Sequence, residues 1–170
     1  VASKHARALV TGTFAGTATF VLFYLMTVFT LSWGTTALHY PRQDFLVLQM
    51  VGVLFFGLTI PLSAQVADRI GSRRMIIFAT FAIIAFGLVL APLLGSGSRL
   101  GVLACLSLGL GFMGLTYGPL GAALSDLFPT AVRYTGASMT FNLAGIVGAS
   151  LAPYLAIWLA THHGLPAVGL

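Results

Sequence analysis

Charged residues, acidic residues and cysteine are all scarce in this sequence. Of its 170 residues 6% are charged, eight basic and three acidic, while 58% are hydrophobic. A soluble domain carries about 25% charged residues to cover its surface, so the composition excludes a soluble globular protein. The one cysteine, Cys105, excludes a disulfide framework and a cysteine-based metal site. The net charge of +5 would suggest nucleic-acid binding in a soluble protein, but in a membrane protein it is a signal of topology.

Patterns that carry catalysis or hold a cofactor are also missing. No Ser/His/Asp constellation, phosphate loop or metal cluster can be assembled, so we expect no enzyme activity, no cofactor, no metal and no nucleic-acid partner. The run Gly109–Gly114 has the glycine spacing of a dinucleotide-binding loop. It lies inside an apolar stretch, with neither a preceding strand nor an acidic residue about 20 positions later, so we interpret it as a chance match. The adjacent His162 and His163 are interpreted as interfacial residues at a helix end.

Charges divide the chain into five uncharged stretches, each longer than the ~20 apolar residues that cross a bilayer as a helix. The short alternating segments of a membrane β-barrel do not occur. The sequence therefore predicts an all-α membrane protein whose residues 1–170 form one transmembrane helical domain. Apolar residues from about 165 predict the first turn of a sixth helix, truncated at the chain end. The five predicted spans are approximately 9–33, 45–66, 75–94, 100–124 and 134–160, with a loop at 34–44 after the first.

Basic residues are distributed unequally between the two sides that five spans create. Arg42 and Arg99 fall on one side, and six basic residues fall on the other. Because cytoplasmic loops are enriched in Lys and Arg, the N-terminus is predicted to be cytoplasmic and the C-terminus external. The six are Lys4, Arg7, Arg69, Arg73, Arg74 and Arg133.

Small residues form two stripes that favour close helix packing. The first stripe is Gly111, Gly114, Gly118 and Gly121 in the fourth span; the second, in the fifth span, is Ser138, Asn142, Gly145, Ala149, Ala152 and Ala156. A substrate passage lined by small residues is the alternative interpretation. Helix kinks are expected at the prolines within spans, which are Pro61, Pro119 and Pro153.

Few polar side chains within the spans could bind a substrate. No acidic or basic residue lies in the middle of a span, where a charge is costly, so no intramembrane proton carrier is evident. Each polar residue can equally be a satisfied packing contact. The candidates for a substrate cavity are Tyr24, Thr27, Gln49, Tyr117 and Asn142.

The loop between the second and third spans concentrates charge around a glycine. Gly71 permits a positive φ in a tight turn, Asp68 can cap a helix end or pair with a guanidinium, and Arg73 and Arg74 can meet anionic lipid headgroups. On this chemistry alone, the loop could be only a turn that sets topology.

Two loops resemble signatures of the major facilitator superfamily, specifically its metabolite:proton symporters. Residues Asp68, Arg69, Gly71 and Arg73 match the Gly-x-x-x-Asp-Arg/Lys-x-Gly-Arg-Arg/Lys loop, with Ala64 in place of the leading glycine. The segment 125–138 resembles the acidic-Leu-Phe-Pro-Thr-x-Val-Arg-x-Thr/Ser-Gly-Ala-Ser segment of those symporters, with Asp126 at the acidic position. The resemblance covers 45–160 strongly and 9–44 loosely.

This resemblance implies the carboxyl-half bundle of a twelve-span transporter of the inner membrane, with the amino-terminal half missing. It implies alternating access and proton-coupled symport of a small metabolite such as a carboxylate or betaine. The implied conformational switch loop contains Asp68, Arg69, Gly71, Arg73 and Arg74, and the implied second cytoplasmic lock contains Asp126 and Arg133. The alternative is a non-transporting polytopic subunit or assembly partner that packs through its glycine faces.

Overall fold

The computed structural model of the chain describes residues 5–169, and its long segments are all helical. Five of its helical segments have the length and apolar composition needed to cross a membrane. The expectation of an all-α membrane protein with five spans is thus confirmed. The five segments are Ala6–Thr36, Arg42–Ile70, Ser72–Gly95, Arg99–Ser125 and Thr130–His163.

Each helix continues beyond the apolar core that the sequence analysis identified. The first continues to Thr36, so the expected loop at 34–44 shrinks to 37–41, and Pro41 directly precedes the next helix. Most of these extensions contain charged residues. A helix can continue beyond the hydrocarbon layer into water, where charged side chains are solvated. In chain order the elements are α1 (Ala6–Tyr24), the π-helical turn η1 (Leu25–Phe29), α2 (Thr30–Thr36), α3 (Arg42–Ile70), α4 (Ser72–Gly95), α5 (Arg99–Ser125), the 3₁₀ turn η2 (Thr130–Val132), α6 (Arg133–His163) and α7 (Pro166–Gly169).

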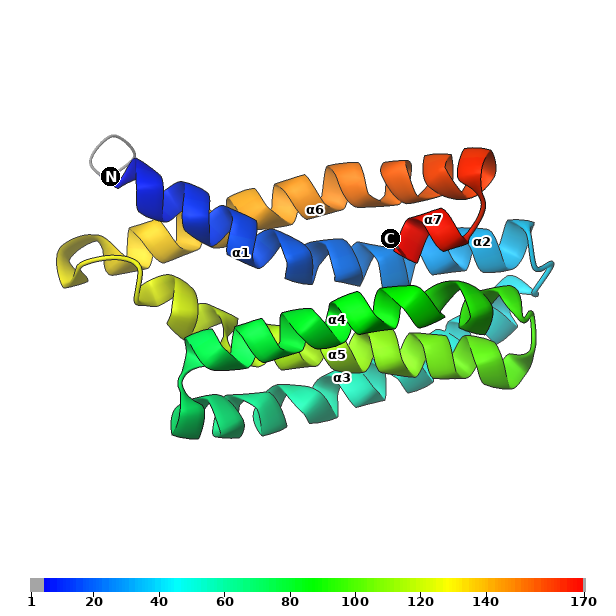
Figure 1. Cartoon of the computed structure of the whole chain (residues 1–170), viewed down its shortest axis with the longest axis horizontal. Coiled ribbons are helices and arrows are strands. Elements are labelled where there is room, and N and C mark those ends of the chain that lie inside the picture. The colour runs from blue at the N-terminus through cyan, green and yellow to red at the C-terminus, as the bar shows by residue number, and fades with distance from the viewer. Residues whose placement is uncertain (1–4, 170) are drawn as a thin grey trace.

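The long helices associate as two pairs with a fifth helix beside them. Helix α1 packs along α6, α3 packs along α5, and α4 packs on α5. In Figure 1, α1 and α6 lie together in the upper part of the view, and α3, α4 and α5 lie together in the lower part. Successive spans run in opposite directions, so the members of each pair run parallel to one another.

Small residues hold α1 and α6 in close contact. A Cβ placed on Gly16 would lie 3.0 Å from the Cβ of Ala144, and one placed on Gly148 would overlap the side chain of Phe20. The buried stripe of α6 differs from the predicted one, because Ser138 and Asn142 are exposed. The buried face of α6 repeats every four residues, and α1 packs on its Thr140, Ala144 and Gly148. The whole face consists of Gly136, Thr140, Ala144, Gly148, Ala152, Ala156 and Ala160.

The glycine stripe of α5 packs against α3 over most of its length. A Cβ on Gly114 would lie 2.8 Å from the carbonyl oxygen of Phe56, and one on Gly118 would lie 2.7 Å from that of Ile60. The packing interpretation is therefore confirmed for these glycines. Gly121, the last member of the stripe, has open space where a side chain would be.

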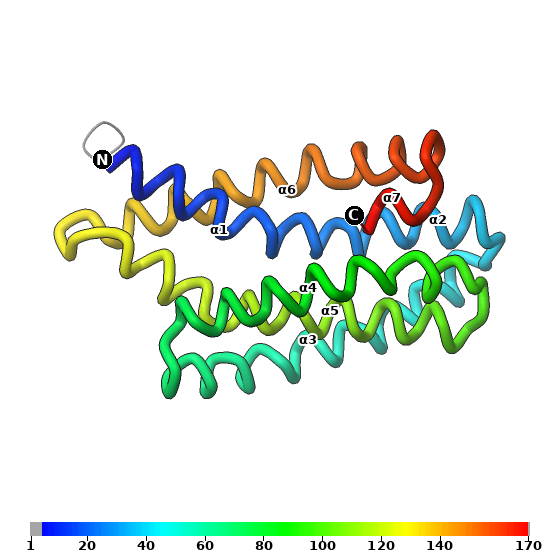
Figure 2. Tube along the Cα trace, in the orientation of Figure 1, coloured from blue at the N-terminus to red at the C-terminus, as the bar shows by residue number. Residues whose placement is uncertain are grey.

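The short helix α7 turns back from α6 and packs against α4. Gly164, with φ of +84°, makes the reversal, and Figure 2 shows the trace bending back at this point. The backbones of Gly87 in α4 and Gly169 in α7 approach so closely that a Cβ on either would overlap the carbonyl of the other. The expectation that residues from about 165 begin a sixth span stays a prediction.

Candidate functional site

The two signature loops lie at the same end of the bundle. The turn between α3 and α4 and the segment between α5 and α6 are both found at the end where α1 begins (Figure 1). Lys4 lies outside the described residues, but the other five basic residues of the predicted cytoplasmic side occur at this end. Arg42 and Arg99 begin α3 and α5 at the opposite end. The side of the membrane that each end occupies stays a prediction.

Gly71 forms the entire connection between α3 and α4. Its φ of +93° confirms the expected positive φ, which a residue with a Cβ adopts only with strain. Asp68 and Arg69 lie in the last turn of α3, Arg73 and Arg74 lie in the first turn of α4, and all four are exposed. Among residues 5–169 Asp68 forms no ion pair and caps no helix. The charges of this loop therefore point outward, where another surface can reach them.

The second loop is fixed by an aromatic side chain. The Phe128 ring is 2% exposed and covers Gly136, where a Cβ would overlap it. The guanidinium Nε of Arg133 donates a hydrogen bond to the Phe128 carbonyl oxygen at 3.3 Å. Asp126 caps the end of α5 with its backbone N–H and is not ion-paired with Arg133. Both charged side chains are exposed on a loop that their neighbours hold in place.

Of the five predicted cavity residues, Tyr117 is the one that joins a larger cluster. Its ring packs edge-to-face against Phe56 of α3, at 5.6 Å between centroids, and against Phe141 of α6, at 6.3 Å. Phe141 in turn packs edge-to-face against Phe20 of α1 at 4.9 Å. These four rings, Phe20, Phe141, Tyr117 and Phe56, are called the aromatic row below. The row connects four helices, and every ring in it is half-buried.

Three other predicted cavity residues do not stack on a ring of the row. Tyr24 lies one helical turn beyond Phe20 and packs edge-to-face against Phe23 at 5.2 Å. Thr27 donates its hydroxyl hydrogen to the Phe23 carbonyl oxygen at 2.7 Å. Asn142 is exposed, and its amide nitrogen donates to the carbonyl oxygen of Ser138 at 2.8 Å.

Gln49, the fifth predicted residue, supports an irregular turn in the first span. In the π-helical turn Leu25–Phe29 the regular α-helical pairing of carbonyl oxygens is lost. The buried Gln49 amide nitrogen donates to the carbonyl oxygens of Met26 and Thr27, at 2.8 and 2.9 Å. Sequence reasoning missed this turn because it looked for helix irregularity at proline, and residues 25–29 contain none.

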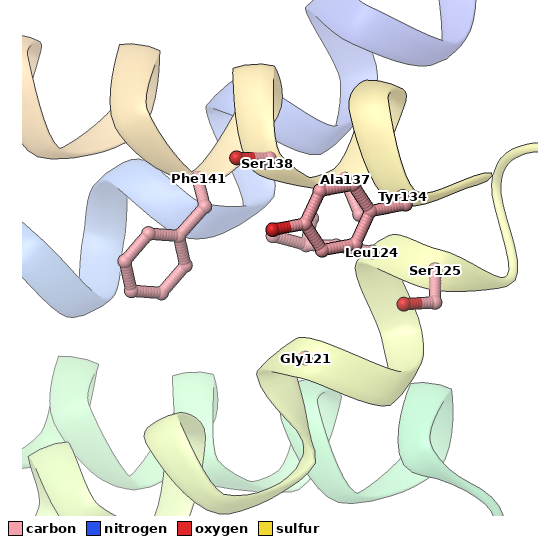
Figure 3. A pocket seen from close by; sticks show the side chains of 7 residues that line it. All are labelled: Gly121, Leu124, Ser125, Tyr134, Ala137, Ser138 and Phe141. Carbon is pink, nitrogen blue, oxygen red and sulfur yellow. The ribbon is translucent and has the colours of Figure 1, made fainter. Parts of the chain in front are cut away.

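A hollow of about 240 Å³ opens between α5 and α6 next to the second loop. Figure 3 shows Gly121 and Ser125 on one wall and Tyr134, Ser138 and Phe141 on the other. The missing side chain at Gly121 is part of the reason that space remains here. Phe141 belongs to both the hollow and the aromatic row. The hollow and the row therefore adjoin at this ring, and the hydroxyl-bearing residues Ser125, Tyr134 and Ser138 line the hollow.

Comparison with known proteins places this geometry in a family. Residues 2–153 match the Major Facilitator Superfamily. The chain is 50% identical to the inner membrane metabolite transport protein YhjE of Escherichia coli K12, over 99% of this chain and 39% of that protein. No solved structure is significantly similar to the chain.

Other relatives are transport proteins with named solutes. The chain is 31% identical to the citrate-proton symporter of Salmonella typhi over 95% of this chain and 38% of that protein. It is 28% identical to the proline/betaine transporter of Salmonella typhimurium over 94% of this chain and 32% of that protein. The chain thus spans about two fifths or less of the length of these relatives, and they are named for transport rather than for catalysis. With the family match covering most of its length, the chain belongs to the major facilitator superfamily, as its two loop signatures indicated.

Proposed function

We propose that the chain is the carboxyl half of a proton-coupled secondary transporter, which moves a small metabolite such as a carboxylate or betaine by alternating access. In this proposal the N-terminus is cytoplasmic in the inner membrane, and an amino-terminal half completes the substrate cavity. The family membership and the partial coverage of the relatives support it.

The observation that carries the proposal is the arrangement of the two signature loops. Both lie at one end of the bundle and present exposed acids, Asp68 from one and Asp126 from the other, that form no ion pair within residues 5–169. The Gly71 turn holds the first loop and the buried Phe128 ring holds the second, so neither loop needs its charged side chains for its own structure. Those side chains are free to contact the other half of the transporter. A second half that rocks against this one would make and break such contacts between two states of the transporter.

Replacing Asp68 tests the switch. In the complete transporter Asp68→Asn should reduce the initial rate of uptake at least several-fold while membrane insertion stays normal, because the charge that contacts the other half is lost. Asp44→Asn is the control, since Asp44 is a partly exposed acid at the other end of the same helix, α3, where it pairs with Arg99 and not with another half of the transporter. Equal uptake rates in the Asp68 variant and the wild type would contradict this role.

Transport itself is tested with a panel of labelled solutes. The complete transporter should take up at least one carboxylate or betaine faster with an inward proton gradient than after an uncoupler has dissipated it. The 170-residue chain alone should not transport, because half a cavity cannot alternate between the two sides. Uptake that ignores the proton gradient would refute the coupling. A reading frame that starts at Val1 with no upstream spans would favour the alternative of a non-transporting subunit.

A further inference from the structure

We infer that the end of the bundle opposite the signature loops carries a contact surface for the amino-terminal half, centred on Arg42, and that its partner there is a carboxylate. This inference rests on the proposed function, because it requires an amino-terminal half. The structural observation behind it is a hollow of about 350 Å³ in which Arg42, the first residue of α3, lies beside the first span. This hollow is called the outer hollow below, because its end of the bundle is external in the proposed topology.

The outer hollow combines an exposed guanidinium with hydroxyl groups. The hydroxyls of Thr27 and Thr35 donate their hydrogens to carbonyl oxygens of their own helix, at 2.7 and 2.9 Å. The donors that remain for a partner are the Arg42 guanidinium and the Ser32 hydroxyl, so the hollow is suited to an oxygen acceptor with negative charge. Besides Arg42 the lining residues, all from η1 and α2, are Thr27, Val28, Leu31, Ser32 and Thr35.

The neighbouring charges leave Arg42 without an ion pair. Asp44, in the same first turn of α3, is paired with Arg99 at 3.0 Å. Within residues 5–169 Arg42 forms no ion pair, and its side chain is exposed. Because the nearby acid is already paired with another arginine, this end of the bundle keeps an uncompensated positive charge. A carboxylate on a second body would balance it, as complementary charges do across protein interfaces.

Alternating access requires contacts between the halves at both ends, each formed when the other is broken. At the signature-loop end, the proposed function assigns such a contact to Asp68. At the outer end Arg42 is the charged residue that can supply one, because Asp44 and Arg99 are bound to each other. Thr27 is both a predicted cavity residue and part of the outer hollow, so a contact at Arg42 would close the cavity on that side.

Substitutions at the two ends should therefore shift the transporter in opposite directions. Ser32 lines the outer hollow and Ser138 lines the hollow between α5 and α6. In the purified complete transporter, the alkylation rates of Ser32→Cys and Ser138→Cys with N-ethylmaleimide report which end is open. Arg42→Gln should raise the ratio of labelling at position 32 to labelling at position 138 by about two- to fivefold, which is the effect of losing a partly exposed ion pair. Asp68→Asn should lower this ratio, and the double variant should return toward the wild-type ratio.

Two further variants test whether the charge of Arg42 is responsible. Arg99→Gln is the matched control, because it removes the same charge from the same end of the bundle, but from an arginine that pairs with Asp44. Arg42→Lys keeps the charge and should retain most of the wild-type ratio. The inference is overturned if Arg42→Gln changes the ratio no more than Arg99→Gln does, or if Arg42→Lys changes it as much as Arg42→Gln.

A carboxylate of the amino-terminal half should reproduce the effect of Arg42. Among the acids that this half presents on the outer side, one Asp→Asn or Glu→Gln variant should raise the labelling ratio as Arg42→Gln does. Combining the two changes should add little, because both remove the same contact. If every such variant leaves the ratio unchanged, or adds fully to Arg42→Gln, the contact does not exist.

Uptake measurements separate this inference from the proposed function. The labelling ratio needs no transport, so opposite shifts in the Arg42 and Asp68 variants would support the contact even if no solute were taken up. Proton-driven uptake together with an unchanged labelling ratio in Arg42→Gln would refute the contact and leave the transporter proposal standing. An unchanged ratio with a KM that rises for anionic solutes alone would show that Arg42 binds solute, and it would also overturn the inference.

Discussion

The side-chain amide of Gln49 on α3 donates hydrogen bonds to two successive carbonyl oxygens of the first span, those of Met26 and Thr27. The contact joins a buried polar side chain to the π-helical turn Leu25–Phe29. The amide and the two carbonyl oxygens satisfy each other's hydrogen-bonding capacity. They need this contact because both are buried in the bundle, away from water. One side chain thus stabilises an irregular turn in a neighbouring helix.

Removing this amide should destabilise the chain. Gln49→Leu leaves both carbonyls without their donor from α3, at a cost of about 1–2 kcal/mol, although the Thr30 hydroxyl still donates to the Met26 carbonyl oxygen. We expect a lower midpoint of thermal unfolding for the purified chain in detergent. The control is Gln65→Leu, the same substitution at an exposed position of the same helix. Equal midpoints for the two variants would contradict the structural role of Gln49.

Two glycines of α5 should respond in opposite ways to the same substitution. Gly118→Ala forces a methyl group against the Ser63 hydroxyl and the Ile60 carbonyl, and overpacking of this kind costs about 1–3 kcal/mol. Gly121→Ala meets open space and gains roughly 1 kcal/mol of helix propensity. Thermal unfolding of the two variants in detergent should place the Gly118 variant below the wild type and the Gly121 variant at or above it. The reverse order would refute the packing of α5 on α3.

The second signature loop should loosen when its buried ring is removed. Phe128→Ala empties the space over Gly136 and removes the ring that holds the segment 126–133 against α6. Hydrogen exchange of that segment should accelerate by more than tenfold, since loss of a buried Phe costs about 3–5 kcal/mol. Tyr134→Ala serves as the control, because that ring is 87% exposed. Unchanged exchange in the Phe128 variant would show that the loop is held by other contacts.

The ion pair between Arg99 and Asp44 should contribute little. The guanidinium nitrogen lies 3.0 Å from the carboxylate oxygen, but the two side chains are 73% and 46% exposed. Exposed pairs are screened by solvent and contribute about 0–1 kcal/mol. A double-mutant cycle with Arg99→Ala and Asp44→Ala, followed by thermal unfolding, should give a coupling energy in this range that decreases with added salt. A larger, salt-insensitive coupling would mean that the pair is shielded from water.

Two kinds of feature could be predicted from the sequence. The first depends on the hydropathy summed over a long stretch, and the second depends on the backbone conformation of one residue. Five spans follow from apolar stretches bounded by charge, because each stretch sums the transfer energy of about 20 residues. The turn at Gly71 follows from the shortness of the loop, because so few residues between two antiparallel spans can only form a tight turn. The packing of Gly114 and Gly118 follows from their spacing of four residues on one helix face.

Features that depend on the partner helix could not be predicted. The fifth span offers several overlapping stripes of small residues, and the one that is buried was decided by the face that Gly12 and Gly16 of α1 present. The bonding of Gln49 to the first span depends on a π-helical turn that carries no proline. The aromatic row likewise joins residues from four helices, and no local pattern marks Phe20, Phe56 and Phe141 as neighbours of Tyr117.

The pairing of α1 with α6 has a consequence for how the protein is made. Gly12 and the Thr140 that covers it are 128 positions apart (140 − 12), and the ribosome adds ~5–20 residues per second. The small-residue face of α1 therefore waits for roughly 6–25 s before its partner is synthesised, because α6 is made last of the five long helices. During that interval lipid or insertion factors must cover the small-residue face of α1. If synthesis stalled before α6, this face would stay unpacked, and quality-control proteases could recognise it.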